Sequence, residues 1–408
     1  MAIKLHNSIP SRAIVITPLI PRQFGGAGPV VMAYLQALSE LYQGRLIYVG
    51  PEFTERLLPS NAIEHKIFIR KRSFFQKFLA VLTLSSIDRL YPYWENHYTK
   101  YLDKEVAVYI LCSRAGRYAR LYRTHGIPVV TVFHNIAEDY VTANPGSWWF
   151  QWVRKTIWKK NEEIAYKYSK LKIVFSKIDA EHLNAMYARP GNAEFIPANG
   201  YFLPRFSEVT GFIPQHYAPC KQMIVLLTCS LRLEQNRKNV QKFISSIWST
   251  FTTKHLSGSV RLIIAGMSPP EELLCLVQKH PNISVVGDPD VQTMQALAQK
   301  AHLYVSTADR GSGIKGRIAH ALGDGLPVVS TAHSAIGYEE VDPRVLRVCK
   351  TQKDFVQTFQ DMAVLQDEEW QKLFTIARSE FDRLFSYDAG KHRLKEWLFS
   401  CKLFAKKD

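Results

Sequence analysis

The sequence lacks the cysteine and histidine spacings that are typical of metal centres and disulfide frameworks. Its six cysteines are scattered, with no Cys-x-x-Cys pair and no neighbouring pair of histidines. They are Cys112, Cys220, Cys229, Cys275, Cys349 and Cys401. Zinc sites and small disulfide-rich domains need ligands or partners at short spacing, so we interpret these residues as reduced thiols of a cytosolic protein. We expect no metal site.

The sequence also lacks long apolar runs. No window approaches the roughly 18 to 20 uninterrupted apolar residues of a membrane-spanning helix. The first stretch, MAIKLHNSIPSRAIVITPLIP, has neither the apolar core nor the cleavage pattern of a secretory signal. We therefore expect neither a membrane-spanning helix nor a cleaved leader.

Acidic residues are scarce relative to basic ones. The chain has 36 Asp and Glu against 52 Lys and Arg, and its formal net charge is +16. Such a charge favours an anionic partner, which could be a membrane surface, a nucleic acid or a phosphorylated substrate. With 47% hydrophobic and 22% charged residues, the 408-residue chain is typical of a folded protein. Its length predicts two domains of about 200 residues.

The first predicted strand leads into a glycine loop. The β-branched run Ala13–Thr17 is followed by Gly25, Gly26 and Gly28, and Pro29 suits the first position of a helix. This pattern predicts a βα unit whose loop lies at the carboxyl end of a strand, where open α/β sheets bind ligands. The loop is not a Gly-x-Gly-x-x-Gly fingerprint, which argues against a dinucleotide enzyme. A purely structural turn is the alternative.

A second glycine turn follows a strand expected at 302–306. The segment 309–331, DRGSGIKGRIAHALGDGLPVVST, predicts a turn, a short helix over 314–322 and a buried strand over 328–330. Lys315 and Arg317 would lie in the first helical turn, where cations are disfavoured unless an anion is bound. The pattern therefore indicates a phosphate site, and an ordinary strand–turn–helix with two surface cations is the alternative.

This segment resembles the nucleotide-sugar site of GT-B glycosyltransferases, especially those of family 4. The residues that fit the family pattern are Gly313, Ile314, Lys315, Arg317, Ala321, Gly325, Pro327, Val328 and Val329. The resemblance implies that Gly313, Ile314 and Lys315 bind the donor. His320 stands where the family has a glutamate that holds the donor ribose, so we expect a changed or weakened ribose contact there.

Two further segments extend the resemblance to the donor phosphates. After a strand expected at 223–227, a basic loop carries Arg232 and Lys238 ahead of a helix expected over 240–251. Family 4-like enzymes grip the donor pyrophosphate with an Arg or Lys and a Lys at this junction, and in the same family the loop around Gly26 closes over the phosphates. Arginine binds phosphate oxygens through two planar donors and lysine adds a point charge. Solvated basic surface is the alternative.

His134 is the candidate catalytic residue. It follows a strand expected over 128–133, at the carboxyl end, where acid–base or polarising groups are well placed. Its context, FHNIAEDY, resembles the His-Asn loop that faces donor sugar and acceptor in many GT-B enzymes. A structural histidine is the alternative.

Tryptophans alternate with basic residues in the segment SWWFQWVRKTIWKK. Trp148, Trp149 and Trp152 suit a membrane–water boundary or an acceptor face, and so do Lys71 and Arg72 in the basic amphipathic stretch 66–84. The alternatives are core residues beneath a basic surface and, for the tryptophans, stacking on single-stranded nucleic acid. We expect no nucleic-acid partner, because the basic residues are spread over several faces rather than forming one known module.

The resemblance implies a fold and an activity for the whole chain. We expect an α/β GT-B fold with two Rossmann-like domains facing a cleft: an acceptor domain over 1–205, a donor domain over 206–385 and a terminal helix, 386–408, that crosses back. The implied function is a retaining, metal-independent hexosyltransferase that uses a nucleotide-diphosphate sugar as co-substrate and no cofactor. We expect a lipid-linked glycan acceptor of envelope polysaccharide synthesis at the inner membrane face. A catalytically impaired scaffold of the same fold, with His320 as the symptom, and a nucleotide-sugar epimerase are the alternatives.

Overall fold

The computed structural model describes residues 10–22, 26–53, 58, 61–68, 98–102, 105–138, 148–205, 222–254, 259–311 and 313–403. The chain forms two compact units. The first comprises residues 1–208, 311–313 and 385–408, and the second comprises residues 209–310 and 314–384. Each unit is an α/β layer structure with its own sheet and its own core.

The sheet of the first unit is parallel throughout. Its order is β3-β2-β1-β4-β5-β6. The strands are β1 (Arg12–Ile16), β2 (Leu46–Gly50), β3 (His65–Phe68), β4 (Val106–Ile110), β5 (Val129–Val132) and β6 (Leu171–Ile173). The central strands, RAIVI and VAVYI, are rich in β-branched residues and almost wholly buried, as expected of parallel strands with helices on both faces.

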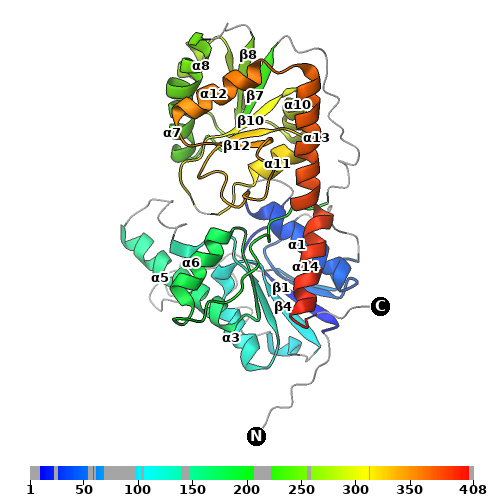
Figure 1. The fold of residues 1–408 in the computed structure, drawn as a ribbon. Helices are drawn as coiled ribbons and strands as arrows, with labels where there is room; N and C mark the ends of the chain where they lie inside the picture. Colours follow the sequence, from blue (N-terminus) through cyan, green and yellow to red (C-terminus); the bar gives the residue numbers. More distant parts are fainter. Residues whose placement is uncertain are drawn as a thin grey trace. The chain divides into compact units, whose positions relative to one another are not determined.

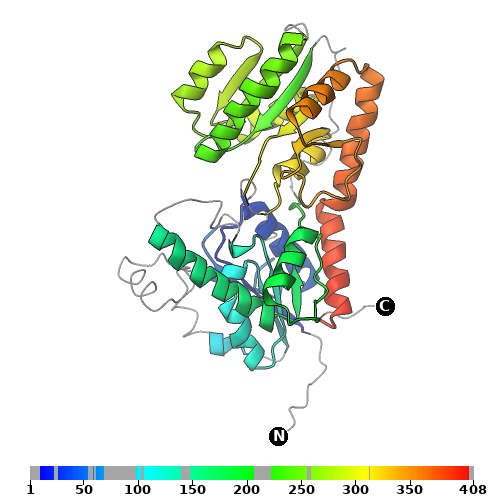
Figure 2. The same cartoon turned by 60° about the vertical axis from the view of Figure 1, so that its left-hand side comes forward.

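Helices surround this sheet (Figures 1 and 2). They are α1 (Gly28–Leu41), α3 (Arg117–Thr124), α5 (Trp148–Tyr168), α6 (Lys177–Tyr187) and α14 (Tyr387–Ser400), with the short helices η3 (Tyr98–Tyr101) and η4 (Ser113–Ala115). Local sequence sets several helix starts. Pro29 opens α1, and the Ser176 hydroxyl caps α6 by accepting a hydrogen bond from the Asp179 amide.

The terminal helix α14 belongs to the first unit, where it lies beside α1 (Figure 1). Lys391 pairs with Glu40 at 2.7 Å, and Arg205 pairs with Asp388 at 2.7 Å. A Cβ atom on Gly390 would lie 2.0 Å from the Phe202 ring, so only glycine permits this close approach. The helix thus packs on the first unit although residues 314–384, which precede it, form part of the second.

The second unit repeats the architecture. Its parallel sheet has the order β12-β11-β10-β7-β8-β9. The strands are β7 (Met223–Thr228), β8 (Val260–Gly266), β9 (Ile283–Gly287), β10 (Leu303–Ser306), β11 (Val328–Thr331) and β12 (Leu346–Cys349). In both units the first strand has neighbours reached by crossovers in opposite directions. This is the doubly wound order with a switch point beside that strand, and it confirms the predicted fold class.

The helices of the second unit pack around its sheet. They are α7 (Glu234–Lys242), the π-helical η5 (Phe243–Trp248), α8 (Ser249–Lys254), α9 (Glu271–Gln278), α10 (Val291–Lys300), α11 (Arg317–Gly323), α12 (Gln352–Ala363) and α13 (Asp367–Leu384). Rings of Phe243, Trp248, Phe251 and Phe359 meet at 5.5 to 6.4 Å and form an aromatic core between η5, α8 and α12.

Two predicted helix starts are wrong. Helix α7 begins at Glu234 rather than Val240, because Glu234 suits a first turn and pairs with Lys238 one turn later. Helix α11 begins at Arg317 rather than Ile314, since Gly313 adopts a φ of 71° and Gly316 precedes the first turn. The described start of the basic stretch 66–84, Lys66 to Phe68, is part of the edge strand β3.

Candidate functional site

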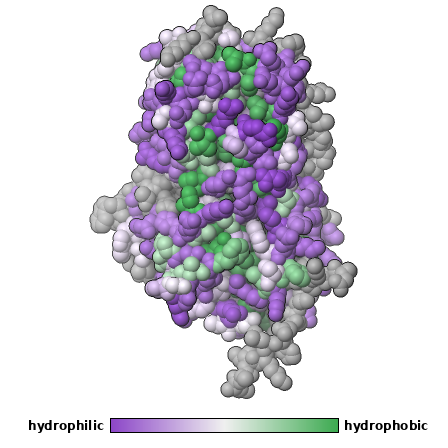
Figure 3. All heavy atoms as spheres, viewed as in Figure 1, coloured by the Kyte–Doolittle hydropathy of each residue, from purple (hydrophilic) through white to green (hydrophobic). Residues whose placement is uncertain are grey.

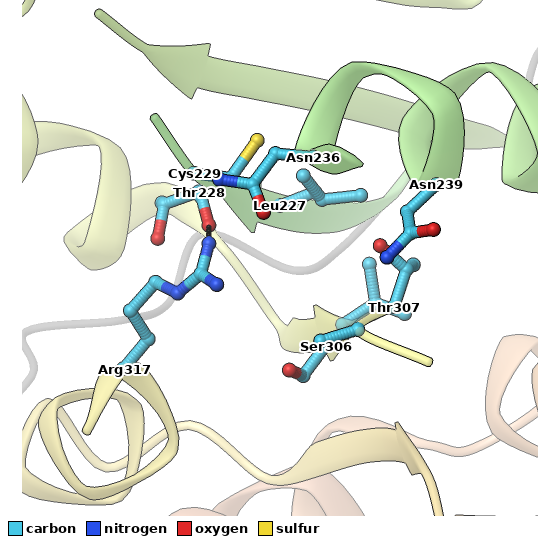
Figure 4. Close-up of a pocket in the computed structure, with 10 residues that line it drawn as sticks. Leu227, Thr228, Cys229, Asn236, Asn239, Ser306, Thr307 and Arg317 are labelled. Carbon is cyan, nitrogen blue, oxygen red and sulfur yellow. Dashed lines mark hydrogen bonds between the residues drawn. The ribbon is translucent and has the colours of Figure 1, made fainter. Parts of the chain in front are cut away.

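A small pocket opens at the switch point of the second unit. It lies at the carboxyl ends of β7 and β10, which are neighbours in the sheet, and α7 and α11 close its sides (Figure 4). Its lining residues are Leu227, Thr228, Cys229, Asn236, Asn239, Val305, Ser306, Thr307, Ala308 and Arg317. Open α/β sheets bind ligands at this place, since strand order reverses there and the neighbouring loops diverge.

Arg317 supplies the positive charge of this pocket. It is the first residue of α11, and its Nη1 atom donates a hydrogen bond to the carbonyl oxygen of Thr228, drawn as a dashed line in Figure 4. Beside it, burial raises the pKa of the Cys229 thiol to about 11, although the Arg317 charge acts in the opposite direction. Cys229 is therefore a neutral thiol at physiological pH, and Arg317 is the charged group among the lining residues named above.

Two asparagines of α7 face the pocket from the other side. Asn236 donates from Nδ2 to the Ser230 carbonyl at 2.9 Å. Asn239 is only 7% exposed, and its Nδ2 atom has no hydrogen-bond partner in the described part of the chain. Figure 4 shows Asn239 and Arg317 on opposite sides of the pocket. A buried donor without a partner is costly, so Asn239 indicates space for an acceptor atom of a ligand.

Arg232 and Lys238, the predicted phosphate ligands, do not line this pocket. Arg232 is exposed just before α7. Lys238 lies within α7, with 64% of its side chain exposed, and its Nζ atom is 2.6 Å from Glu234. Their role in donor binding stays a prediction.

The glycine turns have the backbone that the sequence requires. Gly26 adopts a φ of 60° and Gly313 a φ of 71°, which L-residues rarely tolerate. Ile314 and Lys315 lie between Gly313 and α11, and the Lys315 carbonyl accepts a hydrogen bond from the Tyr338 hydroxyl at 3.0 Å. Because α11 has only seven residues, the charge of Arg317 matters more than the helix dipole.

His320 lies on α11, half-buried, one turn after Arg317. Burial lowers the pKa of this imidazole to about 4, so it is neutral at physiological pH. A neutral imidazole offers one donor and one acceptor, whereas a carboxylate offers two acceptors for a diol. The chemistry at this position therefore differs from that of the glutamate in the resembled family.

His134 is buried at the end of β5 in the first unit. Its ring meets the Phe175 ring edge-on at 5.0 Å. Burial and the nearby Arg114 charge lower the pKa of His134 to about 3, against a hydrogen bond to the Leu111 backbone that acts in the opposite direction. The Nε2 atom has no partner among the described residues. The Leu111 bond therefore belongs to Nδ1, which donates to the carbonyl, and Nε2 carries a lone pair.

The expectation of a metal-independent reaction rests partly on the absence of an Asp-x-Asp motif, and this is wrong, because Asp288 and Asp290 have that spacing. The structure gives both side chains structural tasks. Asp288 accepts a hydrogen bond from the Ser268 amide at 3.0 Å, and Asp290 caps α10 by accepting from the Thr293 amide at 2.7 Å. Across the described ranges, no three His, Cys, Asp or Glu side chains gather as metal ligands would.

The predicted membrane or acceptor face is described only in part. Lys71, Arg72 and the side chains of Trp148 and Trp149 lie outside the described residues. Trp152 is 61% exposed. Among the helices described, none combines the length and apolarity needed to cross a bilayer. The face drawn in Figure 3 is mainly hydrophilic, with small separate hydrophobic areas.

Sequence reasoning missed one residue of the pocket, Asn239. Arg317 was named with Lys315 as a first-turn cation that indicates a phosphate site, although only Lys315 of the two was assigned to the donor. Asn239 gave no signal, since an asparagine next to a lysine is common on helix surfaces. Only the packing of α7 against the end of β10 reveals its unpartnered amide.

Comparisons with known proteins place this geometry in a class. Residues 224–363, which contain all the lining residues of the pocket, match the family model described as Glycosyl transferases group 1. The matched segment is about a third of the chain. Comparison with curated protein sequences finds no match.

Solved structures share the fold over nearly the whole chain. Sucrose-phosphate synthase from Thermosynechococcus elongatus has 15% identity and a TM-score of 0.62, with 95% of this chain and 99% of that chain covered. WaaG, a glycosyltransferase involved in lipopolysaccharide biosynthesis, has 15% identity and a TM-score of 0.61, with 95% and 99% covered. HepE from Anabaena, in complex with UDP and glucose, has 13% identity and a TM-score of 0.61, with 95% and 100% covered.

At these identities the structural likeness defines the fold, which is GT-B. The family match is confined to residues 224–363 of the second unit, and this segment is similar to Glycosyl transferases group 1. The predicted fold and the predicted family resemblance are thereby confirmed.

Proposed function

We propose that the protein transfers a sugar from a nucleotide-diphosphate donor to a glycan acceptor. The observation that carries this proposal is the pocket at the β7–β10 switch point, which lies in the family-matched segment. It combines the guanidinium of Arg317 with the buried Asn239 amide, whose Nδ2 atom has no partner among the described residues. The oxygens of a diphosphate can pair with the Arg317 guanidinium and accept a hydrogen bond from the Asn239 amide. The nucleotide is UDP in this proposal, for which the UDP complex of HepE is the support.

Positive charge near the pocket stabilises the leaving diphosphate in this reaction. Arg317 is already held by the Thr228 carbonyl, so little reorganisation is needed when a phosphate binds. Arg232 and Lys238 join it, as the resemblance implies, if Lys238 exchanges Glu234 for a phosphate oxygen. The turn at Gly313, Ile314 and Lys315 and the loop at Gly26 are proposed to contact the donor as well. We propose that no metal ion takes part.

His134 is proposed to act on a hydroxyl group. Because Nδ1 donates to Leu111, the free Nε2 lone pair can accept a hydrogen bond from a sugar or acceptor hydroxyl and orient it. A pKa of about 3 keeps the ring neutral, so it acts as an acceptor rather than as a charged group. The resemblance to family 4 supports retention of the anomeric configuration.

The acceptor is proposed to be a lipid-linked glycan of envelope polysaccharide synthesis, reached from the inner face of the membrane. The net charge of +16 and the exposed Trp152 support contact with an anionic surface. Flotation with anionic liposomes at low and high salt tests this part separately. Salt-sensitive binding is expected, and no binding at either salt concentration would leave a soluble acceptor.

A panel of UDP-, GDP- and CMP-sugars tests the activity itself. Acceptor-dependent release of UDP from one UDP-sugar is the expected result. Interconversion of free nucleotide sugars without acceptor would instead identify an epimerase. No binding of any nucleotide would identify a scaffold that has lost catalysis, with His320 as the first residue to examine.

A further inference from the structure

An arginine pair lies at the carboxyl edge of the sheet in the first unit, and the proposed donor chemistry does not use it. Arg114 belongs to η4, directly after β4, and Arg154 belongs to α5. Their guanidinium carbons lie 5.1 and 4.5 Å from the ring centroid of one side chain, Trp158. The two charges are thus closer than a Debye length of about 10 Å at 0.1 M salt, and they repel each other.

This arrangement is fixed by close packing rather than by flexible surface chains. A Cβ atom on Gly116 would lie 2.1 Å from the Asn161 carbonyl oxygen and 2.7 Å from the Ala165 methyl carbon. Only glycine allows η4 to approach α5 so closely. Trp158 is 6% exposed, so both guanidinium groups rest on a buried ring while they remain half-buried themselves. The two arginines therefore converge because the fold places them together.

One member of the pair, Arg114, lies near His134. Strands β4 and β5 are neighbours, so η4 and the His134 loop leave the same edge of the sheet. Arg114 is close enough for its charge to act on His134. His134 is only 5% exposed, and its Nε2 atom has no partner among the described residues. An acceptor atom with no donor among the described residues, in a ring on which the charge of Arg114 acts, indicates a ligand that carries both a hydroxyl and an anionic group.

Other charges on α5 increase the local positive potential. The Glu138 carboxylate, which follows the His134 loop, accepts a hydrogen bond from Lys155 at 2.5 Å and lies 3.6 Å from Lys159. Two lysines already neutralise this carboxylate, and they add positive charge to the face that carries Arg154. Helix α5 also carries Glu162, which is buried and accepts a hydrogen bond from the Ala137 amide. Arg114, Arg154, Lys155 and Lys159 outnumber Glu138 and Glu162, so the region favours an anion over a neutral glycan.

We propose that Arg114 and Arg154 bind a phosphate group of the acceptor while Nε2 of His134 accepts a hydrogen bond from an acceptor hydroxyl. A carboxylate has two oxygens and one negative charge, whereas a phosphate has more oxygens and up to two charges, so it suits two guanidinium groups better. The acceptor is accordingly a phosphorylated glycan or a lipid-phosphate-linked one. This inference rests on the proposed function, and it adds the chemical class of the acceptor.

Inorganic phosphate is the probe for this site. Phosphate affinity is measured by calorimetry at constant ionic strength, with potassium chloride as the balance, in the full chain and in Arg114→Gln, Arg154→Gln and Lys160→Gln. Lys160 is an exposed cation of the same helix two residues beyond Trp158, and it serves as the matched control. We expect each arginine variant to bind phosphate about tenfold more weakly, since each loses one charge-assisted contact, and the control to be unchanged.

UDP affinity, measured on the same four proteins, separates the acceptor from the donor as the source of the phosphate. It is expected to stay within about twofold in all four. A parallel loss of UDP affinity in the arginine variants would assign the pair to the donor and overturn the proposal, as would unchanged phosphate affinity. If no protein binds UDP, the proposed function fails while the phosphate measurement still decides this inference. Arg154→Lys keeps the charge and partial binding, and it replaces Arg154→Gln if that variant does not fold.

Discussion

The Nζ atom of Lys238 lies 2.6 Å from the Oε1 atom of Glu234, one helical turn earlier in α7. The lysine that the sequence assigns to the donor diphosphate is thus engaged in an ion pair within its own helix. Both side chains are more than 60% exposed, so the pair contributes little to folding and can open when a ligand binds. The guanidinium of Arg317, by contrast, already lies in the pocket.

This difference predicts an order of effects on donor binding. Arg317→Gln is expected to lower UDP affinity by about tenfold or more, because it removes the charged group of the pocket. Lys238→Gln is expected to lower it by about threefold or less, since an exposed lysine must first leave Glu234. Calorimetric titration with UDP measures both, and thermal unfolding of each variant shows whether loss of the Thr228 contact has disturbed the fold. A larger effect of Lys238→Gln would reverse the assignment.

His320→Glu tests the ribose contact. A carboxylate at this position offers two acceptors for the ribose diol, so UDP is expected to bind about three- to tenfold more tightly to the variant. The gain is expected to vanish with 2′-deoxy-UDP, which lacks one hydroxyl. His320→Gln, which restores no carboxylate, is the matched control. Unchanged UDP affinity in His320→Glu would show that His320 does not face the ribose.

Asp324 predicts an unusual pH dependence of stability. It follows α11, and burial raises its pKa from 3.8 to about 7, although the Arg378 charge acts in the opposite direction. Between these values the folded state holds a proton that the unfolded state has lost, so this group makes the protein less stable as pH rises from about 4 to 7. The full shift corresponds to at most about 4 kcal/mol, and we expect roughly 1 to 2 kcal/mol after local relaxation.

Asp324→Asn isolates this contribution. The variant is expected to be more stable than the parent protein at pH 8 and about equally stable at pH 4, as measured by urea unfolding. His134 and His320 act in the opposite sense, because their lowered pKa values remove stability as pH falls through the range from 6.5 to about 3 or 4. Both proteins contain these two histidines, so the histidine contributions cancel when the free energies of unfolding of parent and variant are subtracted. A difference independent of pH would show that Asp324 titrates normally.

The low pKa of His134 predicts that turnover does not depend on this group in the pH range where a histidine would ordinarily titrate. Its ring stays neutral down to a pKa of about 3. Any inflection of turnover near pH 6.5 should therefore come from another group and persist in His134→Asn. The variant is expected to lose about 100-fold in kcat, because it no longer presents an acceptor at the Nε2 position. A raised KM with an unchanged kcat would show instead that His134 contributes only to substrate binding.

The sequence predicts the fold and part of the site. The β-branched run in β1 and the glycines after it predict a strand and a turn from local physics, whereas the GT-B architecture is what the family resemblance implies. The start of α11 was harder, because Gly313 and Gly316 each compete with the helix and only packing decides between Ile314 and Arg317. The unpartnered atoms of Asn239 and His134 could not be foreseen, since the absence of a partner depends on every neighbour in the folded chain.

A crystal structure of the protein with UDP tests the central claim most directly. The account predicts that the diphosphate lies at the carboxyl ends of β7 and β10, with a phosphate oxygen within hydrogen-bond distance of Arg317 and an acceptor atom of the ligand near Nδ2 of Asn239. UDP bound elsewhere, with both side chains unchanged and unliganded, would contradict it.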